Sequence, residues 1–598
     1  MNREDIYEPL SRFRDEFREK FSSVCKAYLE RLIRESGVDE HANKVLVDQI
    51  CSLETEKADT GKRQSFWKFI LFICILLMAG AVIALIWLFA GESSLDSREK
   101  ILFFAGCAVS FCAGGYGVFF QAIRRIRHFA SAIQSLEERI ETLTAFAWEQ
   151  MEPLNQLFRW ETAAELIEQT VPKIQFDPIF TEQRLHDLIH VFGWNNEYNA
   201  DKSVFSSHSG VLNGNPFVFG EVRKMEWGEK TYTGTLLITW QETVKDSDGH
   251  YHTETRTETL TAYVTKPFPV YKKEKILLYG NEAAPDLSFS RTPSELSGQE
   301  KGFFNSLKKS RELKSLKKFA RNLDDDSNFT MMSNEEFELL FHATDRDDEV
   351  QFRLLFTPLA QQQMVNLLND KQIGYGDDFS FVKECCMNLI RAQHLDDADL
   401  NNDPARFRHY NLARIRSFFA EFYESFFKAV YFALAPLLSV PLYQQTRTRE
   451  TIYGDCAPYK PSFWEYEALA NYLGEEHFRH PLCRTECILK TSEGPEQEDG
   501  SREIRVTASG YRIEERVESV RVYGQDGSYH WVDVPYDEYL EVESESVMAV
   551  AVPAAGKSVS EDKADQMKNL PPEKWKDLYG EVFLRRGVWF CLKNSAKK

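Results

Sequence analysis

The sequence lacks the features that mark several classes of protein. It lacks an excess of basic residues, because its 598 residues carry a formal net charge of −20. A protein that coats nucleic acid needs a basic surface for the phosphates, so no nucleic-acid partner is expected. It also lacks a disulfide framework, since its eleven cysteines are an odd number scattered without regular spacing. Such usage is typical of reduced thiols rather than of a secreted disulfide scaffold.

Local catalytic motifs are missing as well. The sequence contains no G-x-S-x-G, no H-E-x-x-H and no dinucleotide fingerprint. Ala555-Gly556-Lys557-Ser558 looks like the end of a phosphate loop, but the first glycine of that pattern would fall at position 551, which is alanine. We therefore predict no catalytic residue and no nucleotide cofactor. These absences do not exclude an enzyme, because many active sites leave no local signature.

Two long apolar runs dominate the first quarter of the chain. Phe69 to Ala90 and Ile101 to Ile123 contain no charged residue. At about 1.5 Å per residue the first run reaches about 33 Å, which matches a hydrocarbon core of roughly 30 Å. The runs predict a two-helix transmembrane hairpin over residues 66–123. Without intramembrane charges, the hairpin would serve as an anchor rather than as an ion path.

The charges that flank the hairpin predict its orientation. Under the positive-inside rule, basic outer flanks place both termini in the cytoplasm and the short loop outside. No signal peptide precedes the first run, so we expect a multi-pass protein of the cell's inner (plasma) membrane with the bilayer as a partner. The flanking basic residues are Lys57, Lys62, Arg63, Lys68, Arg124, Arg125 and Arg127.

The predicted fold class is α+β, with N-terminal helices and the hairpin followed by cytoplasmic domains that contain antiparallel sheets. Hydrophobic periodicity and turn residues divide the chain into seven segments. They are juxtamembrane helices at 1–65, the hairpin at 66–123, a juxtamembrane helix at 124–172, a β-rich domain at 173–290, a linker with a basic helix at 291–330, an α+β domain with a long aromatic helix at 331–445, and a C-terminal α+β domain at 446–598.

Several elements can be assigned within these segments. A turn at residues 246–249 joins two alternating runs and predicts a β-hairpin, and Gln525-Asp526-Gly527 predicts a second one. Val350–Phe356 is expected to be a strand. Ala429 to Tyr443 is apolar but is only 15 residues long and is interrupted by Pro436 and Pro441. We predict a buried core helix there, with an interfacial helix as the alternative.

A basic amphipathic helix is predicted from Gly302 to Leu323. It has two interpretations: contact with anionic lipid headgroups, or a solvated surface helix packed through its aromatic stripe. The candidate headgroup ligands are Lys308, Lys309, Arg311, Lys314, Lys317, Lys318 and Arg321.

The strongest chemical pattern is H-x2-H-x2-C-x3-C, formed by His477, His480, Cys483 and Cys487. Zinc favours such nitrogen and sulfur ligands, which makes zinc a possible cofactor. His480 precedes a proline, however, and four ligands within eleven residues leave little loop to form a tetrahedron. The alternative is two surface histidines and two buried thiols.

Several local sequences match a known family. They include Gly214-Asn215-Pro216-Phe217, Glu221-Val222, Asp347-Asp348-Glu349-Val350 and the run from Arg353 to Leu359. Over roughly residues 60–385 the chain resembles an uncharacterised family of bacterial two-span membrane proteins, known only as a domain of unknown function. Members are often found beside LemA-like membrane proteins. The resemblance implies a cytoplasmic α+β domain on a membrane anchor and a LemA-like partner, and it implies no known activity.

Two classes of function remain open on the sequence. The first is a membrane-anchored interaction or scaffold protein that recruits other membrane or cytoplasmic proteins. The second is a membrane-tethered enzyme that acts on a membrane-proximal substrate, with its pocket between the second and third soluble domains. A deep cleft lined by polar side chains would favour the enzyme, and an exposed sheet edge or an apolar groove would favour binding.

Overall fold

The computed structural model describes residues 6–89, 119–177, 179–195, 199–245, 250–294, 296, 303–321, 329–446, 460–496, 501–551, 582–585 and 588–591. The chain divides into two compact units. The first unit contains residues 1–24, 160–401 and 422–598, and the second contains residues 25–159 and 402–421.

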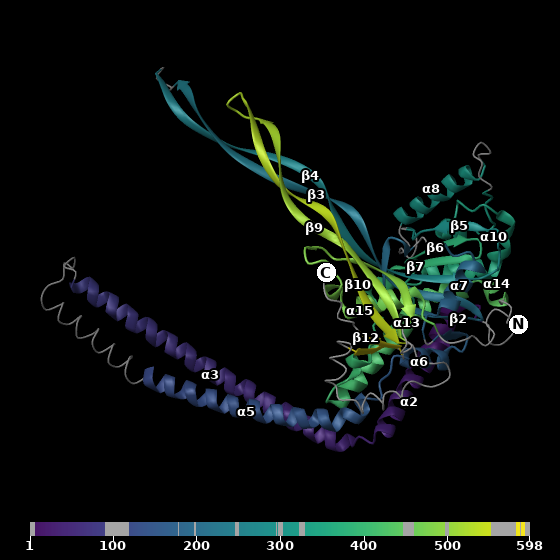
Figure 1. Ribbon diagram of the computed structural model, residues 1–598, viewed down its shortest axis with the longest axis horizontal. Coiled ribbons are helices and arrows are strands. Elements are labelled where there is room, and N and C mark those ends of the chain that lie inside the picture. The colour runs from purple at the N-terminus through teal and green to yellow at the C-terminus, as the bar shows by residue number, and fades with distance from the viewer. Residues whose placement is uncertain are drawn as a thin grey trace. The chain divides into compact units, whose positions relative to one another are not determined.

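The second unit is helical. Most of α2 (Arg18–Ser36) belongs to it, together with the long helices α3 (Glu40–Phe89) and α5 (Phe119–Asn155). The helices α3 and α5 run alongside each other in opposite directions (Figure 1). The Lys57 ammonium lies 2.9 Å from the Glu137 carboxylate, and the Arg125 guanidinium lies 4.9 Å from the centre of the Trp67 ring. These contacts pair the two helices along their polar portions.

The predicted transmembrane hairpin is contradicted. Among the described residues, no helix is long and apolar enough to cross a membrane. The first apolar run forms the end of α3, and residues 101–118 of the second lie outside the described residues. The prediction relied on the length of the two runs and their lack of charge, whereas the first run continues a polar helix that pairs with α5. The multi-pass inner-membrane location and the membrane topology inferred from the flanking charges are corrected with it.

The first unit contains two antiparallel sheets, so the antiparallel α+β part of the predicted fold class is confirmed. The seven-stranded sheet has the order β1-β2-β3-β4-β7-β6-β5, and the five-stranded sheet has the order β11-β12-β10-β9-β8. The strands are β1 (Ile174–Phe176), β2 (Lys202–Leu212), β3 (Asn215–Lys245), β4 (Tyr251–Gly280), β5 (Ser288–Arg291), β6 (Phe379–Glu384), β7 (Met387–Ala392), β8 (Ile488–Glu496), β9 (Ser501–Tyr523), β10 (Tyr529–Ala551), β11 (Val582–Arg585) and β12 (Val588–Cys591).

Helix α15 (Phe463–Leu473) lies between the two sheets. Its Trp464 and Ala468 belong to a core cluster with β2, β3 and β4, whereas its Leu469 and Leu473 pack with β8, β9 and β10. One helix therefore buries opposite faces against both sheets and joins their cores. The remaining helices are α1 (Pro9–Arg12), α6 (Thr162–Thr170), α7 (Glu182–His190), α8 (Phe303–Phe319), α9 (Glu335–Phe341), α10 (Glu349–Leu355), α11 (Pro358–Asn369), α12 (Gln393–Asp397), α13 (Leu412–Leu438) and α14 (Pro441–Gln445).

The strand predicted at Val350–Phe356 is wrong, because Glu349–Leu355 forms α10. The Asp348 side chain caps this helix by accepting hydrogen bonds from the amides of Val350 and Gln351, both at 2.9 Å. An N-cap of this kind satisfies backbone donors that would otherwise lack a partner. Capping therefore outweighs the β-branched and aromatic residues that suggested a strand.

The apolar run from Ala429 to Tyr443 is buried, which confirms the predicted core helix over the interfacial alternative. It occupies the end of α13 and continues into α14. Phe427 stacks on Phe21 with the ring centres 4.3 Å apart, and the Tyr431 hydroxyl donates a hydrogen bond to the carbonyl of Pro9 at 2.8 Å. The N-terminal aromatic residues therefore cover this helix.

Two long β-hairpins extend from the sheets and lie side by side (Figure 1). The first arm, residues 225–245 and 251–270, is the outer part of β3 and β4. The second arm, residues 510–523 and 529–542, belongs to β9 and β10. Both hairpins were predicted from alternation and turn residues, and their antiparallel pairing confirms them. Ile238, Leu260, Val532 and Val534 are buried between the arms.

Gly234 sets how closely the arms approach. A Cβ atom at this position would lie 2.9 Å from the carbonyl carbon of Asp533 and 3.0 Å from the Cα atom of Val534, both in β10. Backbone cannot yield as a flexible side chain can. We therefore expect Gly234→Ala to lower the free energy of unfolding by about 1–3 kcal/mol, as overpacking does. Urea denaturation measures the free energy of unfolding. Thr235→Ala, on the opposite face of the same strand, is the control and should change that free energy by less than about 0.5 kcal/mol. Gly214→Ala cannot serve as a control, because Gly214 has a positive φ of 84°, which alanine rarely adopts.

Candidate interaction surface

The outer faces of the arms expose large apolar side chains. Between Tyr232 and Val264, the even-numbered residues of β3 and β4 face the second arm, so the odd-numbered residues of the unbroken register face away. Most odd positions there are threonine, but Leu237 and Tyr263 are also present and are 67% and 64% exposed. Large exposed side chains gathered on a face mark a contact surface, and each arm has an outer face of this kind. The outer-face set comprises Leu237, Tyr251, Tyr263, Val517, Tyr523, Tyr529 and Trp531.

The densest part of this surface is at the end of the second arm. The rings of Tyr523 and Tyr529 meet edge to face across the hairpin, with their centres 5.0 Å apart. The Arg521 guanidinium lies 4.0 Å from the centre of the Tyr529 ring, and Trp531 pairs directly with Arg521. Trp531 is 63% exposed. Tyrosine, tryptophan and arginine are the residues enriched at the energetic centres of protein interfaces. We call these four residues the aromatic tip.

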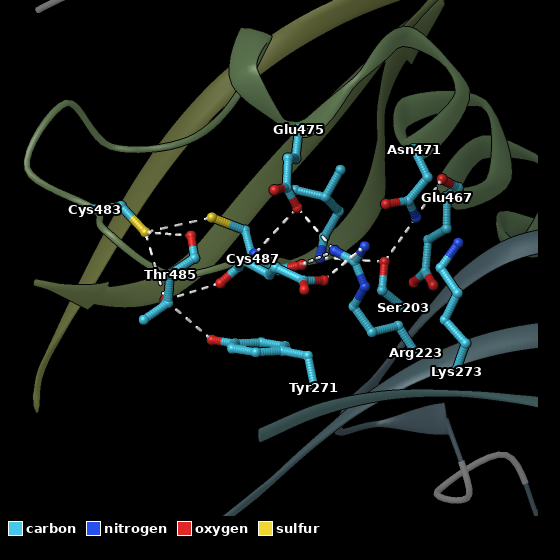
Figure 2. Close-up of polar contacts among 12 residues, drawn as sticks. Ser203, Arg223, Tyr271, Lys273, Glu467, Asn471, Glu475, Cys483, Thr485 and Cys487 are labelled. Carbon is cyan, nitrogen blue, oxygen red and sulfur yellow. Dashed lines mark hydrogen bonds and ion pairs between the residues drawn. The ribbon is translucent and has the colours of Figure 1, made fainter. Parts of the chain in front are cut away.

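A buried polar cluster fixes the base of the arms (Figure 2). Arg223 of β3 pairs with Glu475 and with Glu486, both at 2.8 Å, and its guanidinium lies 4.4 Å from the centre of the Phe205 ring. The Glu475 carboxylate also accepts a hydrogen bond from the Cys487 amide at 3.2 Å. Arg223 thereby ties the strand that enters the first arm to the loop that precedes β8.

Two thiols lie beside this ion pair. The sulfur atoms of Cys483 and Cys487 are 3.6 Å apart and both residues are buried. Burial raises the pKa of the Cys487 thiol, and the neighbouring Cys483 raises it further. Between them in the sequence, the Thr485 hydroxyl lies 3.2 Å from the Tyr271 hydroxyl of β4 and accepts a hydrogen bond from the Tyr511 amide at 3.0 Å. The loop therefore contacts the second arm and the part of β4 next to the first arm.

A third buried group lies on α15. The Glu467 carboxylate is fully buried, lies 2.8 Å from the Lys490 ammonium and accepts a hydrogen bond from the Val204 amide at 3.1 Å. Burial raises the pKa of Glu467 to about 7, against the lowering effect of Lys490. The Asn471 amide of the same helix donates to the Ser203 hydroxyl at 2.7 Å (Figure 2).

The structure brings together only half of the predicted zinc ligands. Cys483 and Cys487 are adjacent, whereas His477 is exposed at the end of a 3-10 turn, Glu475–His477. His480 uses its Nδ1 atom to accept a hydrogen bond from the Leu482 amide at 3.1 Å. Within the described ranges, no group of three or more histidine, cysteine, aspartate or glutamate side chains is arranged to hold a metal. The arrangement matches the alternative of surface histidines and buried thiols.

The predicted basic helix forms α8. Leu316 is buried, Phe319 contacts Phe329 with the ring centres 5.6 Å apart, and Lys317 pairs with Glu335 at 2.6 Å. The helix is thus packed through its apolar stripe. Lipid binding by its basic residues stays a prediction. Lys308, Arg311, Lys314, Lys318 and Arg321 are exposed, whereas Lys309 and Lys317 are partly buried.

One pocket lies in the second unit and has a volume of about 370 Å³. Its Asn155 side chain donates to the His409 carbonyl at 3.4 Å and accepts from the His409 amide at 3.2 Å. Its Gln156 side chain donates to Glu152 at 3.0 Å. Three polar side chains of this pocket, Glu152, Asn155 and Gln156, are therefore already engaged in hydrogen bonds within the protein.

The sequence patterns did not identify the interaction surface. Alternation in the hairpins could have assigned the side chains to two faces. It could not show which face a second hairpin covers, because that depends on packing between strands far apart in the sequence. Tyr232 and Asp537, whose side chains hydrogen bond at 3.1 Å, are 305 residues apart.

Comparison with known proteins found no match to the chain among family models, curated proteins or solved structures. The resemblance to two-span membrane proteins and the LemA-like partner therefore stay predictions.

Proposed function

We propose that the chain is a non-catalytic interaction protein that binds a partner protein through the outer faces of its two arms. The observation that carries the proposal is the aromatic tip, Arg521, Tyr523, Tyr529 and Trp531. Its side chains are exposed beyond what the fold requires, since the core between the arms is built from the opposite face.

The arms supply two properties that a binding surface needs. They are rigid, because each is a continuous antiparallel ladder and each buries apolar side chains against the other. They are also tied to each other by ion pairs, which join Lys230 to Asp537 at 3.1 Å and Lys266 to Glu518 at 2.6 Å. A preorganised surface loses less entropy on binding than a loop of the same composition.

The chemistry of the surface favours a partner with an apolar groove and acidic groups at its rim. Rings supply the apolar contact area, and Arg521 supplies a cation beside them. Among the described residues, the pocket at Trp148 and Asn155 gives the enzyme alternative no comparable support, because its Glu152, Asn155 and Gln156 side chains already form hydrogen bonds within the protein.

The test compares captured proteins between matched variants. Wild-type chain, a Tyr523→Ser/Tyr529→Ser/Trp531→Ser triple variant and a Val350→Ser/Leu354→Ser double variant are tagged and isolated from cells of the source organism. Val350 and Leu354 are exposed apolar residues of α10, remote from the arms in the sequence. Quantitative mass spectrometry should show a partner whose recovery falls at least ten-fold in the triple variant and is unchanged in the double variant. Equal recovery of every protein by all three chains would contradict the proposal.

A further inference from the structure

The end of the first arm is a free-standing ribbon of two strands. The turn of the second arm reaches only to Ile238 and Glu258: the Gln525 amide donates to the Glu258 carboxylate at 2.7 Å. Beyond this point β3 and β4 continue for several residues (Figure 1). We call residues 239–245 and 250–258 the ribbon end. A two-stranded ribbon without a packed face is marginally stable in water, so a further strand would stabilise it.

The outer edge of β4 is open at the ribbon end. From His252 to Glu258, β4 pairs with β3 on one side, and among the described residues no strand pairs with the other. Edges of this kind are normally protected by lysine or proline, yet neither occurs between Tyr251 and Thr265. The segment instead contains threonine at alternate positions, which favours strand pairing.

The charges along this edge are self-complementary. Suppose that two copies of His252–Glu258 pair antiparallel with Thr255 opposite its own copy. Glu254 then lies opposite Arg256, and His252 lies opposite Glu258, each pair occurring twice by symmetry. Moving the twofold axis by one residue would place Glu254 opposite Glu254 or Arg256 opposite Arg256. Like charges directly opposite each other destabilise a sheet, which disfavours these two registers. Moving the axis by two residues, to Thr253 or Thr257, avoids like charges but keeps only His252–Glu254 or only Arg256–Glu258 pairs. The register centred on Thr255 therefore has the most complementary charge pairs.

The contacts within one chain do not oppose this pairing. Arg256 pairs with Glu242 at 2.8 Å and His252 with Glu254 at 3.0 Å, and all four side chains are about half exposed. Ion pairs of this kind contribute little to stability, so their rearrangement has a small cost. These four residues are even-numbered and lie on one face of the unbroken β3–β4 ladder.

We infer that the chain self-associates through the β4 edge of the ribbon end, with Thr255 on the twofold axis. Two ribbons then form one four-stranded antiparallel sheet. The partner is a second copy of this chain. The inference does not depend on the proposed function, which uses the outer faces of the arms rather than this edge.

Cysteine crosslinking of the full chain tests the register. Thr255→Cys places two thiols opposite each other across the axis, within the Cα separation that a disulfide needs. Thr253→Cys is the matched control, because residue 253 would lie opposite residue 257 of the other copy. Under oxidised glutathione we expect a covalent dimer with Thr255→Cys and no more than the wild-type background with Thr253→Cys. Equal crosslinking of both variants, or of neither, would overturn the inference.

Charge exchange tests the chemistry. We expect Arg256→Glu to weaken self-association about ten-fold or more, because two Glu–Glu oppositions replace two Glu–Arg pairs. The double variant Glu254→Arg/Arg256→Glu restores both pairs and should recover the wild-type dissociation constant in sedimentation equilibrium. A wild-type chain that stays monomeric at tens of micromolar, or a double variant as weak as Arg256→Glu, would reject the pairing. Neither result would affect capture of a partner by the aromatic tip.

Discussion

Replacing Arg223 by methionine is expected to lower the free energy of unfolding by about 2–3 kcal/mol, measured by urea denaturation. The guanidinium is buried and pairs with Glu475 and Glu486, both at 2.8 Å. Methionine keeps much of the side-chain volume but leaves the Glu475 carboxylate with only the Cys487 amide. Because Glu475 and Glu486 are partly exposed, water compensates in part, and the loss stays below that of a fully buried pair.

Lys273→Met is the matched control. The Lys273 ammonium lies over the same Phe205 ring, at 4.0 Å from its centre, but its side chain is 49% exposed and pairs with Glu221 at 3.2 Å. We expect a loss below about 1 kcal/mol. If both variants lost the same free energy, the contact with the ring would be responsible, and the assigned role of the ion pairs would be wrong.

A second readout separates stability from the organisation of the arms. Arg223 lies in β3 beside Lys224, the last residue of β3 that pairs with β2, so it anchors the strand where it leaves the seven-stranded sheet. Hydrogen exchange should therefore increase in the first arm and in the loop from Glu475 to Cys487 before it increases in the core around Trp464. Uniform exchange across the first unit would instead indicate a global loss of stability.

Sequence patterns predicted those structural elements that are determined by a few neighbouring residues. The turn at Gln525-Asp526-Gly527 and the alternation around it predicted the second hairpin, and the structure forms it with Gly527 at a φ of 78°. Periodicity and length likewise predicted the buried end of α13. These signals are local because a turn conformation or a helical apolar face is encoded within a few residues.

Features that depend on distant residues were not predictable from those patterns. Arg223 meets Glu475 across some 250 residues, and nothing near either residue indicates the other. The zinc pattern placed His477 and His480 with the cysteines by spacing alone. In the structure the two thiols are adjacent, whereas His477 is exposed and the His480 Nδ1 atom accepts a hydrogen bond from the Leu482 amide. Val350–Phe356 had the composition of a strand, but the cap at Asp348 makes it a helix.

Glu467 gives the largest expected dependence of stability on pH. Its pKa in the folded chain is raised to about 7, from an ordinary value of 4.5, chiefly by burial. A raised pKa means that the folded state binds the proton more tightly than the unfolded state. The contribution of this group is therefore fully present below about pH 4.5 and is lost as the pH rises through about 7. Ionisation of Glu467 as the pH rises between these two values should lower the free energy of unfolding by about 3 kcal/mol.

Glu467→Gln should flatten this dependence, because glutamine resembles the protonated acid in shape and does not ionise. Near pH 5 the variant should be close to the wild type in stability, and near pH 8 it should be more stable. Its side-chain oxygen can still accept the hydrogen bond from the Val204 amide. Urea denaturation at a series of pH values from 5 to 8 measures how steeply the free energy of unfolding depends on pH in the wild type and in Glu467→Gln.

Lys490→Met should act in the opposite direction. Lys490 lies 2.8 Å from Glu467 and lowers the pKa of that carboxyl, so its removal raises the pKa further and extends the loss of stability above pH 7. The variant also loses hydrogen bonds from the ammonium to the carbonyls of Asn199 and Lys202, both at 2.7 Å. That loss is independent of the ionisation of Glu467, so the slope and not the absolute stability is diagnostic. Parallel slopes for wild type, Glu467→Gln and Lys490→Met would show that Glu467 does not titrate in this range.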